Sequence, residues 1–227
     1  LSERNQKSAI ETDKKEQEIL ISAIKKKEGK YKKDLKKKIK EEKRIAAKID
    51  KIIRNEIARA NRLALAKLKN IPKSTKKNEF ILSPEAKVLA TNFELNKGKL
   101  PWPIEEGLVV RRFGKQSHPS FPGITVNGTG LHIVTSKGSY AEAIFNGEVL
   151  NVLVGSGGTK NVMIRHGNYI TSYNNLENSY VKKGDGIVTG QKIGEIFTDK
   201  ITGKTTLVFV LLKNTKKLNP ASWMLKR

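Results

Sequence analysis

The stretch Gly128-Thr129-Gly130-Leu131-His132-Ile133-Val134-Thr135 places two glycines directly before a run rich in β-branched and apolar residues. Glycines in front of such a run are typical of a tight turn that leads into a β-strand. The strand-like runs of the chain are Gly107–Phe113, Leu131–Thr135, Ala141–Val154, Asn161–Tyr173, Gly186–Phe197 and Thr205–Leu212. Short strands separated by turn residues, with no helical period between them, predict an antiparallel all-β domain over residues 99–227.

The first 70 residues have a helix-forming composition. From Ser2 to Asn70 there is no proline and one glycine, Gly29, while Ala, Leu, Ile, Lys, Glu and Arg dominate. The core positions of one seven-residue frame hold apolar Ile21, Ile24, Tyr31, Leu35, Ile45, Ile49 and Ile52, and polar Glu28, Lys38, Glu42 and Glu56. We predict a helical arm over residues 1–70 that forms an interrupted coiled coil. The alternative is a single amphipathic helix that lies on a partner or on the β domain.

Two short segments join the arm to the β domain. Residues 71–81 have the composition of a linker, in which Pro72 ends the helix. Residues 82–98 predict a short amphipathic helix, with Ser83 as its N-cap and Pro84 at its first position. The predicted fold class is therefore α+β, with a long N-terminal helical arm followed by an antiparallel all-β domain.

Charge and composition limit the partners. The chain holds 45 Lys and Arg against 22 Asp and Glu, a net charge of +23, which favours anionic partners. The lysine-rich run of residues 25–40 has no arginine and one aromatic residue, Tyr31, so we expect no nucleic-acid binding.

No apolar run approaches the roughly 20 residues of a membrane span. The absence of cysteine excludes disulfides and thiol catalysis. Because the chain starts at Leu1 inside a helical pattern, we expect a fragment whose upstream part, such as a signal peptide, is not shown.

A series of motifs in the β region resembles one known family. The motifs include Leu100-Pro101-Trp102-Pro103, Arg112-Phe113-Gly114, Gly130-Leu131-His132, Arg165-His166-Gly167-Asn168, Val181-Lys182-Lys183-Gly184-Asp185 and Asn219-Pro220. In this order they resemble the LytM-type, lysostaphin-like peptidase domain over about residues 99–225. With the helical region upstream, the arrangement is most similar to EnvC-type murein hydrolase activators of Gram-negative bacteria.

The resemblance implies a zinc site that this chain has lost. Active members hold zinc with the His and Asp of an H-x-x-x-D motif and the last His of an H-x-H motif. Gly128 stands at the position of the first ligand and His132 at that of the Asp. Thr206 and Val208 stand at the two histidines of the H-x-H motif, and Asn175 replaces a catalytic histidine. We therefore expect no zinc, no other cofactor and no catalytic residue.

The remaining histidines do not complete a site. His118 and His166 match histidines of the family that are not ligands, so both are expected to be structural or surface residues. Two alternatives to the activator role stay open. One is a zinc murein endopeptidase with relocated ligands, and the other is a basic scaffold that binds wall polymers.

The resemblance to the activators also implies partners and a location. These proteins bind and switch on an N-acetylmuramoyl-L-alanine amidase through the vacated groove during septal murein splitting. The expected contact residues here are His132, Tyr173, Asn175, Thr206 and Val208, with Lys160 and Arg165 as basic contacts for an acidic partner segment. The resemblance further implies a periplasmic location near murein and an FtsEX-type membrane complex that acts on the arm.

An upstream helix covers the groove in the activators that this chain resembles. Two candidates for that element are the helical segments Ile45–Leu68 and Pro84–Asn96, whose apolar faces permit docking. We favour the longer one. A covered groove would lower the apparent affinity for a partner in the resting state.

Overall fold

The structure is a computed structural model that describes residues 2–67, 78–117, 123, 125–200 and 202–226. Its helices are α1 (Ser2–Lys67) and α2 (Pro84–Leu95), with short 3₁₀ turns η1 (Ser156–Gly158) and η2 (Pro220–Ser222). The strands are β1 (Leu108–Arg111), β2 (Gly114–Ser117), β3 (Thr125–Gly128), β4 (Leu131–Thr135), β5 (Tyr140–Glu142), β6 (Gly147–Val154), β7 (Lys160–His166), β8 (Tyr169–Leu176), β9 (Gly186–Ile187), β10 (Lys192–Glu195), β11 (Thr205–Lys213) and β12 (Lys216–Leu218).

One antiparallel sheet forms the centre of the β domain. Its strand order is β1-β4-β11-β8-β7-β6-β9, and β12 pairs with β11. Two small ribbons, β10–β5 and β2–β3, lie beside it. The antiparallel β domain that the sequence predicts is confirmed. Three of the predicted runs each divide into two strands, because a bend at Ile144 and Phe145 and turns at Gly167 and Gly190 interrupt them.

The two faces of the central sheet bury separate apolar clusters. Strand β11 shows this directly, because neighbouring side chains of a strand point to opposite faces. Phe209 belongs to the larger cluster, and Val210 belongs to the smaller one. The larger cluster is the core of the β domain, whereas the smaller one is completed by residues from outside it.

Helix α2 covers the face with the larger cluster. Ser83 caps the helix by accepting a hydrogen bond from the backbone N–H of Ala86, which confirms the predicted helix start. Phe93 is fully buried, and its ring stacks on those of Tyr169 and His166 with centroids 4.8 and 5.0 Å apart. The short helix therefore docks on the sheet through one aromatic side chain.

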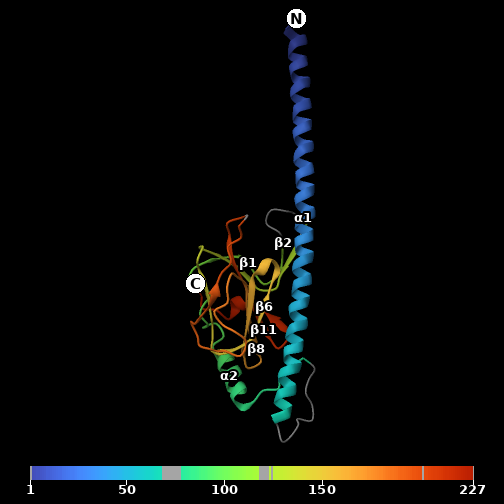
Figure 1. The fold of residues 1–227 in the computed structure, drawn as a ribbon. Helices are drawn as coiled ribbons and strands as arrows, with labels where there is room; N and C mark the ends of the chain where they lie inside the picture. The colour runs from blue at the N-terminus through green and yellow to red at the C-terminus, as the bar shows by residue number, and fades with distance from the viewer. Residues whose placement is uncertain (1, 68–77, 118–122, 124, 201, 227) are drawn as a thin grey trace.

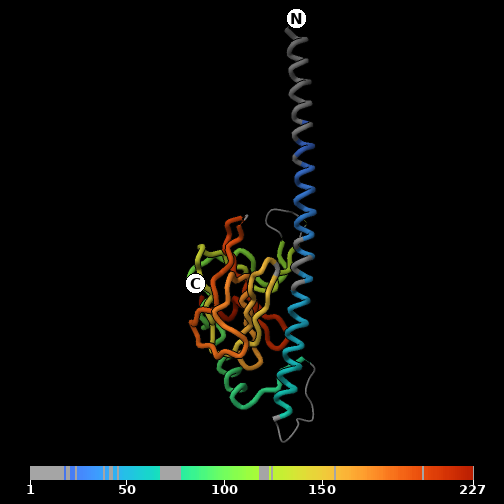
Figure 2. The backbone as a smooth tube through the Cα atoms, in the orientation of Figure 1, coloured from blue at the N-terminus to red at the C-terminus, as the bar shows by residue number. Residues whose placement is uncertain are grey.

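Helix α1 covers the opposite face (Figure 1). Ile53 and Ile57 are 0% and 2% exposed and belong to the smaller cluster, together with Leu150 and Met163 of the sheet. The N-terminal part of α1 extends beyond the β domain, as Figure 2 also shows. The later part of the predicted seam is thus occupied by the sheet, since Ile52 packs against the same cluster. A coiled coil along the earlier part stays a prediction.

The end of the predicted linker belongs to the folded domain. Phe80 is buried in the smaller cluster, and its N–H donates to the side chain of Asn214. Asn61 of α1 accepts a hydrogen bond from the Ile81 N–H at 2.8 Å and donates to the carbonyl of Glu79 at 2.7 Å. Residues 68–77 lie outside the described part of the chain, so the rest of the linker prediction is not covered.

No helix in the described residues combines the length and apolar composition needed to cross a membrane.

Candidate functional site: a groove beneath helix α1

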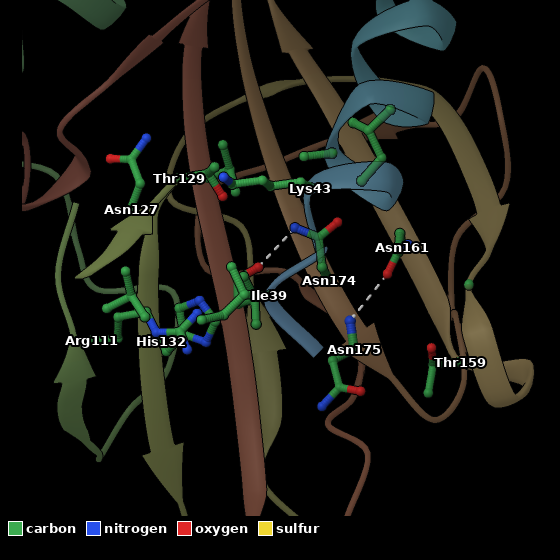
Figure 3. Close-up of a pocket in the computed structure, with 16 residues that line it drawn as sticks. Ile39, Lys43, Arg111, Asn127, Thr129, His132, Thr159, Asn161, Asn174 and Asn175 are labelled. Atoms are coloured by element: carbon green, nitrogen blue, oxygen red, sulfur yellow. Dashed lines mark hydrogen bonds between the residues drawn. The ribbon is translucent and has the colours of Figure 1, made fainter. Parts of the chain in front are cut away.

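A groove of about 420 Å³ lies on the sheet at the point where α1 passes over it. Its floor comes from His132 of β4, Val208 of β11 and Asn174 of β8, which sit side by side in the strand register. Its remaining lining residues are Ile39, Lys43, Ala46, Ile49, Arg111, Val126, Asn127, Thr129, Gly155, Thr159, Asn161, Asn175 and Val210. The groove therefore has three neighbouring strands as its floor and one face of α1 as its cover (Figure 3). Residues of β1 and β3 flank it on one side, and the connection between β6 and β7 flanks it on the other.

His132 is half-buried in this groove. Burial, and then the nearby positive charge of Arg111, lower its pKa to about 4. The register of β1 and β4 places Arg111 directly opposite His132. The imidazole is therefore neutral at pH 7, and a cation stands beside it.

Gly128 cannot carry a side chain in this backbone. A Cβ atom built on it would collide with the carbonyl oxygen of Arg112, which is itself held by a hydrogen bond from the Gln116 side chain at 2.6 Å. Gly128 stands at the position of the first zinc ligand in the family that the chain resembles. It has no donor atom, and the Arg112 backbone occupies the space that a side chain would take.

Two adjacent asparagines fix the strand β8 side of the groove. Asn174 donates from Nδ2 to the carbonyl of Val208 at 2.9 Å, and Asn175 donates from Nδ2 to the carbonyl of Thr206 at 2.7 Å. The Asn175 backbone has a φ of 71°, and its N–H donates to the side chain of Asn161. These amides join β8 and β11 at the point where a catalytic histidine would stand.

The residues present do not fit a catalytic zinc ion. Such a site needs three protein ligands and an open position, and His132 supplies one neutral imidazole beside a guanidinium group. Val208 offers no donor atom. Within the described ranges no three His, Cys, Asp or Glu side chains come together. His118 lies outside those ranges.

The expected contact residues fall into three groups, which line the groove, lie beside it, or lie away from it. His132, Asn175 and Val208 line the groove. Thr206 lies next to it and contributes its carbonyl to Asn175, and Lys160 begins β7 between two lining residues.

Tyr173 and Arg165 require correction. Tyr173 is 0% exposed, and its hydroxyl accepts from the Ile144 N–H inside the core, so it offers no surface to a partner. Arg165 lines a different cavity of about 660 Å³, where its guanidinium lies 4.0 Å from the Phe80 ring centre and donates to the Gly167 carbonyl. Their strands run past the groove, but these two side chains do not point into it.

His166 has a structural role, which is one of the two roles that the sequence analysis expected for it. It is fully buried, and burial lowers its pKa to about 4. Nδ1 lies 2.6 Å from the carbonyl oxygen of Asn146, which can only accept, so Nδ1 carries the proton. Nε2 then accepts from the hydroxyl of Thr171 at 2.9 Å.

Sequence reasoning found only part of the helix side of the groove. Ile39, Lys43, Ala46 and Ile49 are spaced by four, three and three residues, which places them on one face of α1. The predicted covering segment began at Ile45, six residues after the first lining residue. Helix α2 contributes no lining residue to the groove. The spacing could have identified this face, but nothing in the sequence says what the face contacts.

Part of the β domain matches a known protein family. Residues 127–220 match the sequence model of Peptidase family M23. The chain carries an M23, or LytM-like, domain. A comparison with curated protein sequences finds no match.

The chain is also similar to several solved structures. Helicobacter pylori Csd3 is 24% identical with a TM-score of 0.47, over 56% of this chain and 35% of that one. A zinc-containing peptidase from Vibrio cholerae is 24% identical with a TM-score of 0.47, over 57% and 41%. The SpoIIQ–SpoIIIAH pore-forming complex matches at 19% identity with a TM-score of 0.46, over 57% and 93%. The match therefore spans less than half the length of the first two proteins.

Proposed function

We propose that this protein is a non-enzymatic, EnvC-type activator of an N-acetylmuramoyl-L-alanine amidase. It acts in the periplasm, where septal murein is split, and its M23 domain recognises the amidase instead of cutting murein. One observation carries the proposal: a helix of the same chain is seated on the groove in which the zinc ligands of the fold would stand, and those ligands are missing.

The groove is suited to recognition. Its floor offers apolar Val208 and Val210 beside the amides of Asn174 and Asn175, which gives a mixed surface for a helix of another protein. Neither Val208 nor Gly128 supplies a donor that would hold an ion. The site therefore has the shape of a peptidase cleft and the chemistry of a protein-binding groove.

Helix α1 supports an autoinhibited resting state. We name residues 36–49 of α1 the cover segment, because its side chains line the groove, and residues 50–61 the anchor segment. The anchor segment holds the helix on the sheet through the buried Ile53 and Ile57. A partner that needs the same groove binds only the fraction of molecules whose cover segment has moved away, so its apparent affinity is reduced by that fraction.

The N-terminal part of α1 is exposed, so a regulatory partner can bind it. Along the described side chains of residues 18–34, only Lys32 is partly buried, and Ile21 and Tyr31 are 50% and 61% exposed. We propose that an FtsEX-type membrane complex binds there and moves the cover segment. The continuous helix would transmit this motion, because no proline or glycine occurs between Lys30 and Lys67.

Dye release from labelled murein tests the proposed function. A purified amidase is assayed alone, with the wild-type chain, and with a chain carrying Ile53→Asn to loosen the anchor segment. We expect the loosened chain to raise amidase turnover well above the wild-type level. The full length is kept because removal of α1 would expose Leu150, Met163 and Ile170 of the smaller cluster.

Two controls define the outcomes that would reject this function. Leu63→Asn changes an α1 side chain that is 52% exposed, so it should leave activation at the wild-type level. Release of dye by this chain without any amidase would instead establish an endopeptidase. Equal amidase turnover with wild-type and loosened chains, after each is shown to be folded, would overturn the proposal.

A further inference from the structure

One face of α1 carries a row of cations. Steps of three or four residues along a helix return to the same face, and such steps from Lys26 to Arg62 visit eleven positions. Nine of the eleven are Lys or Arg, two are neutral, and none is acidic. We call these nine cations the basic stripe: Lys26, Lys30, Lys33, Lys37, Lys40, Arg44, Lys48, Lys51 and Arg62. The basic stripe is about 54 Å long, from the rise per residue of an α-helix.

The basic stripe points away from the β domain. The face of α1 that contacts the sheet and its groove carries Ile39, Ala46, Ile49, Ile53 and Ile57. The centre of that face lies roughly 170° around the helix axis from the centre of the stripe, given the residues per turn of an α-helix. Every residue of the stripe is exposed, and Figure 1 shows the β domain on the other side of α1. The nine cations therefore face outward together.

The acidic residues of α1 lie off this face, and three of them have partners outside the stripe. Glu28 lies 2.6 Å from Lys32, which is one turn away on the same helix. Glu56 and Asp50 lie 2.7 and 3.1 Å from two lysines of the β domain, Lys183 and Lys217. These three carboxylates are therefore directed to other cations, and the positive charge of the stripe is left facing solvent.

The composition of the stripe limits what it can bind. Its two neutral positions are Asn55 and Ala58, so it has no aromatic side chain on which nucleic-acid bases could stack. A helix that inserts into a membrane surface needs an outward apolar face, whereas the apolar face of α1 is turned to the sheet. A flexible anionic polymer would have to be held straight along the row, which costs conformational entropy. A flat anionic surface can instead meet all nine cations at once.

We propose that the basic stripe binds the anionic headgroups of a phospholipid membrane, with α1 lying along the surface and the β domain on the far side of the helix. Lipids diffuse within the membrane, so their phosphates can gather beneath the row of cations. Each Lys or Arg near an anionic membrane strengthens binding roughly fivefold, and this attraction fades within a Debye length. The inference goes beyond the proposed function, because it does not depend on an amidase.

Vesicle flotation with the full chain tests this inference. Vesicles of neutral phosphatidylcholine are compared with vesicles in which part of this lipid is replaced by anionic phosphatidylglycerol. We expect the protein to bind the anionic vesicles at least about a hundredfold more tightly than the neutral ones at about 0.1 M salt. At about 0.5 M salt this binding should be lost, because screening shortens the reach of each charge and no apolar side chain of the stripe enters the lipid.

Two sets of substitutions with the same change in net charge separate the stripe from the overall charge. The stripe set is Lys30→Gln, Lys33→Gln, Lys37→Gln and Lys40→Gln. The control set removes four exposed cations of the β domain: Lys99→Gln, Lys137→Gln, Lys182→Gln and Lys204→Gln. Gln has nearly the helix propensity of Lys, so α1 should keep its structure, which circular dichroism checks. The stripe set should weaken binding to anionic vesicles at least about a hundredfold, and the control set about threefold or less.

Several results would overturn the inference. They are equal binding to neutral and anionic vesicles, no binding to anionic vesicles at low salt, and equal losses for the two sets of substitutions. Binding to isolated murein that the stripe set abolishes, without binding to vesicles, would assign the stripe to a wall polymer instead. The amidase assay in solution contains no membrane, so the failure of this inference and the failure of the proposed function are distinguishable.

Discussion

His132 of β4 lies directly opposite Val208 of β11 in the antiparallel register. Residues opposed in this way have Cβ atoms about 5 Å apart, close enough for two side chains to share one ligand. The resemblance to the LytM family places an Asp and a His of the zinc site at these two positions. Here they hold a neutral imidazole and an isopropyl group, so the strand pairing of a metal site is kept without its ligands.

Restoring two ligands at these positions should not create a catalytic zinc site. His132→Asp together with Val208→His supplies two donors, but a third donor at Gly128 is blocked by the Arg112 carbonyl. We expect no stoichiometric zinc after dialysis against micromolar metal, measured by atomic emission on the purified double variant. Stoichiometric zinc together with murein cleavage would show that the backbone at Gly128 adapts.

Gly128→Ala should destabilise the protein although it adds a single methyl group. The collision is with the backbone of Arg112, which no side-chain rotation relieves, so we expect a loss of about 2 kcal/mol or more in the free energy of unfolding. Gly186→Ala is the matched control, because a Cβ there meets nothing within 4 Å. Its effect should stay within about 0.5 kcal/mol. Urea unfolding followed by circular dichroism measures both, and equal effects would refute the steric argument.

Stability should fall as the pH is lowered from 6.5 toward 4. The pKa of His166 is about 4 in the folded state, below its ordinary value of 6.5, so the unfolded chain takes up the proton first. The stabilisation is complete above pH 6.5, and roughly 2 kcal/mol of it should be lost at pH 5 for this one residue. His132 acts in the same direction, since its pKa is also about 4.

Nuclear magnetic resonance can assign this pH dependence to residues. The Cε1–H signals of His132 and His166 should stay unchanged from pH 8 to pH 5. His132→Asn should reduce the loss of unfolding free energy over that range. Titration of either signal near pH 6.5 would contradict the burial that the structure assigns to it.

Ile57→Ala should release α1 from the sheet more readily than Leu63→Ala. Ile57 is 2% exposed, and truncation of such a side chain costs about 2–5 kcal/mol. Leu63 is 52% exposed on the same helix, so its truncation should cost under about 1 kcal/mol. Limited proteolysis of α1 under native conditions measures the difference. Equal cleavage rates for the two variants would show that Ile57 does not anchor the helix.

Much of the fold followed from local sequence. The turn residues between β-branched runs predicted antiparallel strands, and Ser83-Pro84 predicted the start of α2. Strand boundaries were less certain, because the run Asn161–Tyr173 contains a buried turn at Gly167. Tyr173 was assigned to the groove from the resemblance to the family, and Arg165 was assigned as a nearby basic contact. Alternation of side chains between the two faces of a strand sends Tyr173 into the core, whereas Arg165 lies on the same face as Met163 but farther along β7, at the other cavity.

The sequence by itself determined that the chain has no H-x-x-x-D and no H-x-H motif, because a missing motif is visible without a structure. It also determined the helical and β regions, since their composition and period depend on neighbouring residues. Only the tertiary structure decided that residues 36–49 cover the vacated groove and that residues 50–61 hold them there. The physical reason is that both segments share one continuous helical pattern. Contacts across more than 90 residues, such as that between Glu56 and Asn151, give them different roles.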